Sequence, residues 1–135
     1  MNKSQFLSGA ALDLPLYAPE KTERTEAALR MIALMRECDG LVICSPAYHG
    51  SVSGLVKNAL DYLEDLSKDE RPYLDGRSVG LIATAYGDQA TMSTLQTLRA
   101  IVHALRGWPT PMGATIRTYH GLFSPDGECL EDRAR

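Results

Sequence analysis

A loop around residue 48 carries residue types that suit the binding of a flat ligand. It follows an apolar run at 39–44 and precedes a helix predicted at 53–66. Glycines at positions 50 and 54 have no side chain, so the backbone can come close to whatever occupies the space beside them. In open α/β sheets, ligands bind in the crevice outside the carboxyl ends of the strands. The loop therefore predicts a ligand crevice at the end of its strand.

Two apolar runs predict the strands that position this crevice. Residues 39–44 and 78–84 are short and apolar, as parallel strands buried on both faces are. Proline removes a backbone donor, so we expect the chain to leave the sheet at Ser45 and Pro46. A turn at 85–89 follows the second run. We expect the two loops to lie side by side at the carboxyl edge of the sheet.

The remaining segments predict alternating helices and strands. A helix that begins after Thr22 has its apolar residues at helical spacing, with Thr22 as its N-cap. Ser93 and Gln96 fit a capping box that opens a further helix. A last strand is expected at 113–119, and the polar tail from residue 124 is expected to be loose.

This order predicts the fold class and the domain organisation. Strands that alternate with helices require right-handed crossovers and a parallel sheet, so the class is α/β, doubly wound. Ser51 or Ser53 is a suitable N-cap for the helix at 53–66. No repeat or linker divides the chain, and we expect one domain over residues 1–135.

Composition excludes several classes of function. The chain has 135 residues, 44% of them hydrophobic, and a net charge of −3, which argues against nucleic acid as a partner. Three cysteines without metal-ligand spacing predict no metal site and a reducing compartment. No apolar run approaches a membrane span, and the N-terminus lacks a signal core. We therefore expect a cytoplasmic protein.

Residues 44–62 also carry a family resemblance. They resemble the signature Ser-Pro-x-Tyr-x-Gly-Ser-x-x-Gly-x-x-Lys-Asn-Ala-x-Asp of the NAD(P)H-dependent FMN reductases, which are flavodoxin-like enzymes. The residues that match are Ser45, Pro46, Tyr48, Gly50, Ser51, Gly54, Lys57, Asn58, Ala59 and Asp61. The resemblance implies that this loop lies against the isoalloxazine ring of FMN, and that the turn after the second strand forms the other wall. The cofactor-binding residues that it implies are Ser45, Pro46, Ala47, Tyr48, His49, Gly50, Ser51, Tyr86, Gly87 and Asp88.

Several of these residues have a second interpretation. His49 is either a flavin contact or a solvated loop residue. Tyr86 either stacks on the flavin or closes the top of the sheet, and Asp88 is either part of the wall or a turn acceptor. His103 is expected in solvent, and His120 is expected to border the crevice. We assign no catalytic residue, because the cofactor carries the hydride chemistry.

The resemblance also predicts what the chain lacks. Members of the family open with a strand that runs into a Gly-Ser-x-Arg-x-x-Ser phosphate loop, whereas this sequence begins like the segment after the second strand. It also stops before the final helix. We therefore expect a truncated flavodoxin-like domain without the first strand and first helix, with an open sheet edge and weak FMN binding. Lys57 and Asp61 in the helix at 53–66 are either an exposed ion pair or contacts across a homodimer.

Three functions follow from these observations. The first is an NAD(P)H-dependent FMN reductase-type oxidoreductase, which transfers hydride from NAD(P)H to FMN and on to flavin, quinone or another small acceptor. The alternative is a truncated, catalytically silent module that only dimerises. An electron carrier ranks last, because it would also need the phosphate loop and would be more acidic.

Overall fold

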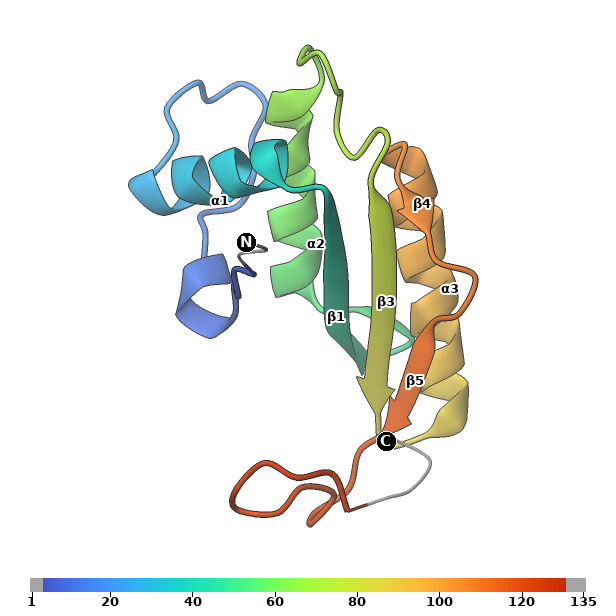
Figure 1. Cartoon of the computed structure of the whole chain (residues 1–135). Helices are drawn as coiled ribbons and strands as arrows, with labels where there is room; N and C mark the ends of the chain where they lie inside the picture. The colour runs from blue at the N-terminus through green and yellow to red at the C-terminus, as the bar shows by residue number, and fades with distance from the viewer. Residues whose placement is uncertain (1–3, 131–135) are drawn as a thin grey trace.

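The computed structural model describes residues 4–130 and shows a mixed sheet with helices packed against it (Figure 1). The strands are β1 Gly40–Tyr48, β2 Ser51–Val52, β3 Ser78–Ala85, β4 Trp108–Pro109 and β5 Ala114–Arg117. The helices are α1 Glu26–Glu37, α2 Gly54–Asp61 and α3 Asp88–Ala104, with 3₁₀ turns η1 Gly9–Leu12 and η2 Tyr62–Leu66. The sheet order is β2-β1-β3-β4. β5 also pairs with β3, further along that strand than β4 does. The predicted α/β class is confirmed.

The pairing of the strands brings their carboxyl ends to one edge. β1 runs parallel to β3 from Gly40 opposite Ser78 to Pro46 opposite Thr84. β5 also runs parallel to β3, and its last residue Arg117 lies opposite Ala85. The loops that follow β1, β3 and β5 therefore gather at the same edge, as predicted for the first two.

The described helices cover one face of the sheet. In Figure 1, α2 lies beside β1, and α3 lies behind β4 and β5 next to β3. Val79 and Leu81 of β3 are buried in one core cluster together with Leu98 of α3. By contrast, Val42 of β1 is 67% exposed, so the expectation that this strand is buried on both faces is wrong for the described residues.

Crossover handedness explains this one-sided arrangement. The crossover through α2 leads from β1 to β3, and the crossover through α3 leads from β3 to β5. Both steps move across the sheet in the same direction, and right-handed crossovers in one direction place their helices on the same face.

β1 extends further than predicted. It continues through Pro46 to Tyr48, so the expectation that the chain leaves the sheet at Ser45 and Pro46 is wrong. Pro46 has a strand partner on one side, Thr84 of β3, in the described sheet. A proline without an N–H is tolerated at such an edge position.

Two helix starts also differ from the prediction. Thr25, not Thr22, caps α1, and its Oγ1 accepts a hydrogen bond from the Ala28 amide at 3.3 Å. α3 begins at Asp88 directly after Gly87, whereas Ser93 lies inside the helix and donates its hydroxyl to an earlier carbonyl.

The chain beyond β5 is more regular than the predicted loose tail. The Ser124 amide donates to the Glu128 carbonyl at 2.8 Å, and the Leu130 amide donates to the Leu122 carbonyl at 2.9 Å. Phe123 and Cys129 form an antiparallel bridge between these bonds. Figure 1 shows this folded segment projecting beyond the carboxyl ends of the strands.

Candidate functional site

The loops at the carboxyl edge of the sheet form the candidate site. The loop at 47–50 follows the paired part of β1, and the loop at 86–87 follows β3. A third loop begins after β5, where the Thr118 amide donates to the Ala85 carbonyl at 2.7 Å. The structure therefore brings together the two predicted walls, residues 45–51 and 86–88, and adds a third segment that the sequence did not single out.

The first wall is a tight hairpin. Ala47 pairs with Val52 and Tyr48 with Ser51, which leaves His49 and Gly50 as the turn. Both turn residues have positive φ, at 51° and 87°, as the primed turns of two-residue hairpins require. Among residues 4–130, no atom beyond the adjoining residues lies within 4 Å of the position that a Cβ would take at Gly50, so the backbone there faces open space.

Ser45 supports this hairpin from inside the protein. Its side chain is fully buried, and its hydroxyl donates to the Pro46 carbonyl at 2.8 Å and accepts from the Ser53 amide at 3.0 Å. Ser53 in turn caps α2 by accepting from the Val56 amide at 3.1 Å. Of the two predicted caps of this helix, Ser53 is confirmed. The end of β1 and the start of α2 are thus joined by a short hydrogen-bonded chain.

Asn58 of the signature points away from the hairpin. Its Oδ1 accepts from the Tyr17 amide at 2.8 Å, and its Nδ2 donates to the carbonyls of Leu14 and Pro15 at 3.1 and 3.0 Å. These bonds fasten the segment before α1 onto α2.

Lys57 and Asp61 form an ion pair within one chain. The Nζ–Oδ1 distance is 2.5 Å, and both side chains are exposed. An exposed pair at this spacing contributes about 0.3–0.5 kcal/mol to a helix. The geometry of the single chain thus matches the simpler of the two expectations.

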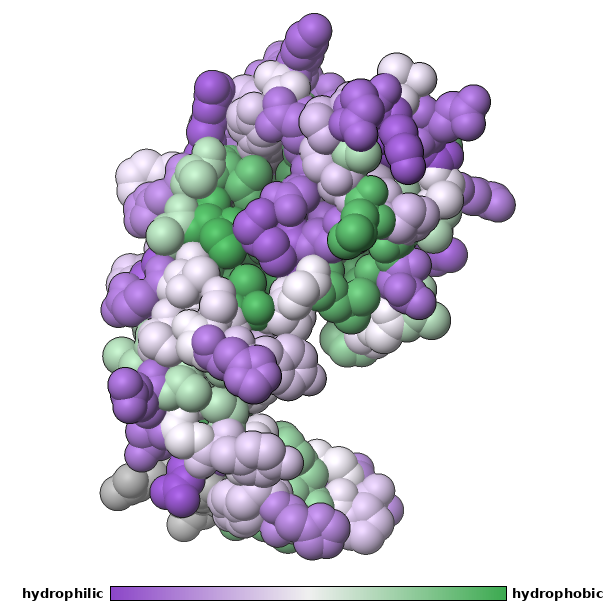
Figure 2. All heavy atoms as spheres, turned by 180° about the vertical axis from the view of Figure 1, so that it is seen from behind, coloured by the Kyte–Doolittle hydropathy of each residue, from purple (hydrophilic) through white to green (hydrophobic). Residues whose placement is uncertain are grey.

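The second wall consists of Tyr86, Gly87 and the first residue of α3, Asp88. Tyr86 is 83% exposed, which excludes the interpretation that it closes the top of the sheet by packing. Tyr48 on the first wall is also largely exposed, at 61%. Two aromatic rings at one edge suit the stacking of a planar ligand. Figure 2 shows the projecting segment after β5 separated from the main body by an open hollow.

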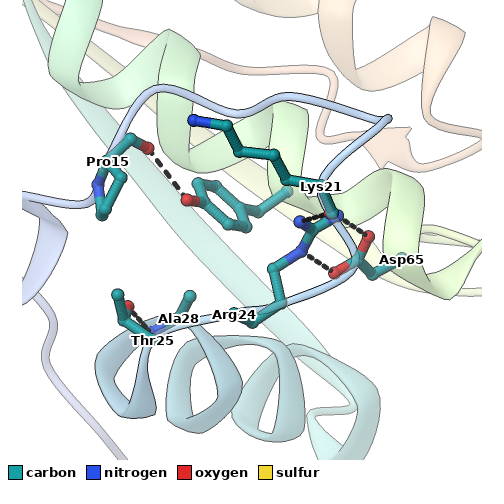
Figure 3. A network of polar contacts seen from close by, with 7 residues as sticks. Pro15, Lys21, Arg24, Thr25, Ala28 and Asp65 are labelled. Atoms are coloured by element: carbon teal, nitrogen blue, oxygen red, sulfur yellow. Dashed lines mark hydrogen bonds and ion pairs between the residues drawn. The ribbon is translucent and has the colours of Figure 1, made fainter.

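A cluster around Arg24 is structural and was not predicted (Figure 3). Arg24 donates to both carboxylate oxygens of Asp65, at 2.7 and 2.9 Å, and also to the Lys21 carbonyl. Its guanidinium lies 5.0 Å from the centre of the Tyr17 ring. Burial, followed by the nearby charge of Asp65, raises the pKa of Tyr17 above its usual value. The cluster holds the segment between η1 and α1 against η2.

A surface cavity lies at the opposite edge of the sheet, between Arg36, Asp69, Arg71 and Arg77. Arg77 directly precedes β3 and is buried, and its guanidinium donates to main-chain carbonyls that include those of Arg36 and Cys38. This arginine ties the end of α1 to the start of β3 and takes no part in the candidate site.

Three further findings concern the described residues. Within residues 4–130, no group of histidine, cysteine, aspartate or glutamate is placed to hold a metal ion. No helix in that range is long and apolar enough to cross a membrane. His103 and His120 are both exposed.

Comparison with known proteins gives consistent matches. The model of the family described as NADPH-dependent FMN reductase matches residues 4–120. The NADPH azoreductase of Bacillus sp. (strain OY1-2) is 33% identical over 121 residues, which cover 89% of this chain and 63% of the relative. The FMN-dependent NADPH-azoreductase of Staphylococcus saprophyticus is 42% identical over 76 residues, 56% of this chain and 37% of the relative. The chain thus spans less than two thirds of these curated relatives.

Solved structures confirm the flavodoxin-like fold. The flavoenzyme NAD(P)H:(acceptor) oxidoreductase FerB from Paracoccus denitrificans aligns with a TM-score of 0.74 and 20% identity, over 92% of this chain and 68% of that one. An oxidoreductase from Corynebacterium diphtheriae aligns with a TM-score of 0.64 and 23% identity, over 80% of this chain and 56% of that one.

Proposed function

Because this chain belongs to the NADPH-dependent FMN reductase family, we propose that the carboxyl edge of its sheet binds FMN and supports NAD(P)H-dependent reduction of a small acceptor. The observation that carries the proposal is the register of β1 and β3. It places the hairpin at 47–50 beside the turn at 86–87.

The open backbone of the hairpin fits a flavin ring. Apart from the adjoining residues, no described atom lies within 4 Å of the position that a Cβ would take at Gly50 or Gly87, so a planar group can approach the main chain at both walls. In this proposal, main-chain groups of residues 47–50 would contact the polar edge of the ring. When bound, FMN supplies the site that accepts hydride. The exposed rings of Tyr48 and Tyr86 flank that ring and restrict its orientation.

The buried signature residue Ser45 contributes to the site by fixing the conformation of the hairpin. Ser45 contacts the protein interior, so we assign it a positioning role beneath the hairpin. Pro46, Ala47, His49 and Ser51 belong to the same hairpin and complete the proposed wall. We assign these residues to binding and orienting the ring, because the cofactor carries the hydride chemistry.

The relatives suggest the class of acceptor. Both curated relatives described above are called azoreductases, so we propose azo compounds, quinones or free flavin as acceptors, with NADPH or NADH as the donor.

We also propose that the protein is cytoplasmic and forms a homodimer through α2. This helix presents Lys57, Asp61 and a partly exposed Leu55. Size measurements on wild-type protein and on a Leu55→Asp variant test the assembly. A monomeric wild type contradicts it.

An FMN titration of the purified chain tests the site. We expect the fluorescence of FMN to change on saturable binding, and NADPH oxidation to follow when an azo dye is added. Tyr86→Ala should weaken binding, whereas Trp108→Ala, an exposed aromatic at the opposite edge beside Ser78, should not. A chain that is folded by circular dichroism but leaves FMN fluorescence unchanged would instead support the silent module.

A further inference from the structure

We propose that the Arg117 guanidinium, anchored on the Tyr86 carbonyl at the rim of the crevice, binds a phosphate group of the nicotinamide dinucleotide. This inference rests on the proposed function and adds a residue that binds the electron donor. The residue belongs to β5, outside the signature that predicted the site.

Arg117 is held at the rim by contacts on both its backbone and its side chain. It is the last residue of β5 and pairs with Ala85. The next residue, Thr118, donates its amide to the Ala85 carbonyl at 2.7 Å, and the Arg117 Nε donates to the Tyr86 carbonyl at 3.1 Å. The guanidinium is therefore hydrogen-bonded to the second wall, and this bond restricts its position.

Most of the donors on this guanidinium remain available. An arginine head group carries five N–H donors, and the bond to Tyr86 uses the one on Nε. Among residues 4–130, the Nη groups of Arg117 have no acceptor, and no carboxylate lies within 4.0 Å. Arg99 shows the contrast, because its two Nη atoms are bonded to the carbonyls of Thr110 and Pro111. Arg117 thus offers a fixed fork of donors on an exposed surface.

In the segments that form this edge, Arg117 supplies a positive charge and Asp88 a negative one. The sequence places no other lysine or arginine in segments 45–51, 85–88 or 114–121. Guanidinium groups recognise phosphate with paired, charge-assisted hydrogen bonds. Within these segments, Arg117 is the residue suited to that role.

The position of β5 is compatible with the binding of a dinucleotide whose nicotinamide ring lies over the flavin. The flavin is expected between the loops of β1 and β3, and β5 lies beyond β3 on the far side from β1. Neighbouring strands are about 4.8 Å apart, so Arg117 lies roughly 10 Å across the sheet from the first wall. The phosphates of a dinucleotide extend away from its nicotinamide ring, and Arg117 lies on a path that they can follow.

Binding of NADP⁺ and NAD⁺ to the FMN-loaded chain, measured by calorimetry, tests the proposal. We expect Arg117→Gln to weaken NADP⁺ binding by about tenfold or more and Arg117→Lys to weaken it less, because lysine keeps the charge but not the fork. Arg30→Gln is the matched control, since Arg30 is an exposed arginine on α1. It should leave binding unchanged.

The pattern of losses identifies the phosphate that is bound. A loss confined to NADP⁺ assigns the 2′-phosphate, whereas equal losses for NADP⁺ and NAD⁺ assign the pyrophosphate. Either result supports the proposal if the Arg117→Gln variant retains its FMN affinity and, in turnover assays, its KM for the nicotinamide dinucleotide rises with kcat unchanged. Affinities for both dinucleotides within twofold of wild type overturn it, as does a wild-type chain that binds FMN but neither dinucleotide. Failure to bind FMN while NADP⁺ binding still depends on Arg117 would refute the proposed function alone.

Discussion

Replacing Asn58 with alanine should destabilise the protein without altering the ligand-facing side of the hairpin. Asn58 makes three hydrogen bonds of 2.8 to 3.1 Å with the backbone of residues 14–17. Leu14, one of the partners, belongs to the buried core. Alanine at position 58 removes every one of these bonds and leaves backbone groups of the partner segment without acceptors or donors.

The size of the effect follows from the number of bonds. Each intramolecular hydrogen bond contributes about 1 kcal/mol net, and a buried group left unpaired costs about 1–3 kcal/mol. Three bonds therefore predict a loss of about 3 kcal/mol in the free energy of unfolding. Domains of this kind are stable by about 5–15 kcal/mol in total, so such a loss is easily measured.

Urea unfolding followed by circular dichroism measures this loss. Asn58→Asp keeps the acceptor for the Tyr17 amide but places a carboxylate against two carbonyls, so it should be at least as unstable as the alanine variant. Lys57→Ala is the control on the same helix, because Lys57 is exposed and makes a surface ion pair; it should change stability by about 0.5 kcal/mol or less. A loss below about 1 kcal/mol for Asn58→Ala, or an equal loss for Lys57→Ala, would refute this reasoning.

Three further predictions concern single positions. Gly50→Val should cost about 1–2 kcal/mol of stability in urea unfolding, because φ is 87° there, and should weaken FMN binding by obstructing the approach to the backbone; Gly87→Ala, at φ −122°, is the unstrained control for the urea measurement. Thr94→Val should raise stability by about 1 kcal/mol in urea unfolding, since its buried hydroxyl has no partner among the described residues, and a loss would contradict this. Cys44 reaches solvent, yet desolvation by the surrounding protein raises the pKa of its thiol above its usual value. Its alkylation rate should reach half-maximum at a higher pH than that of a free cysteine, and the stability that the neutral thiol contributes should fall as pH rises through the folded pKa.

The parts of the fold predicted correctly are those with a long, uniform pattern. The apolar runs at 39–44 and 78–84 became β1 and β3, because several consecutive apolar residues are needed in a sheet with helices packed on it. Parallel pairing of these runs then placed the loop at 47–50 beside Tyr86, which was the central expectation for the site.

The errors arose where a local signal competed with packing. Ser93 and Gln96 match a capping box, but α3 starts five residues earlier, at Asp88. Thr91 and Thr94 are buried in that stretch, so tertiary contacts extend the helix past the local cap. The two-residue strand β2 was missed, since two residues are too few to show an alternating pattern.

Arg117 shows a different limit of prediction from sequence. Its importance depends on the pairing of β5 with β3, which brings position 117 to the Tyr86 carbonyl across 31 residues of chain. Nothing in the local sequence Ala-Thr-Ile-Arg signals that contact. Residues whose role arises from strand pairing become visible once the register is known.

The residues of the signature fall into two groups with different structural roles. Ser45 and Asn58 are bonded to protein backbone, whereas Tyr48 and Gly50 lie at the open surface. A match to this signature is therefore mainly evidence for the shape of a hairpin and for the segment that holds it. Such a site suits a reaction in which the cofactor carries the chemistry, because the protein then needs to supply an accurately placed backbone rather than a reactive side chain.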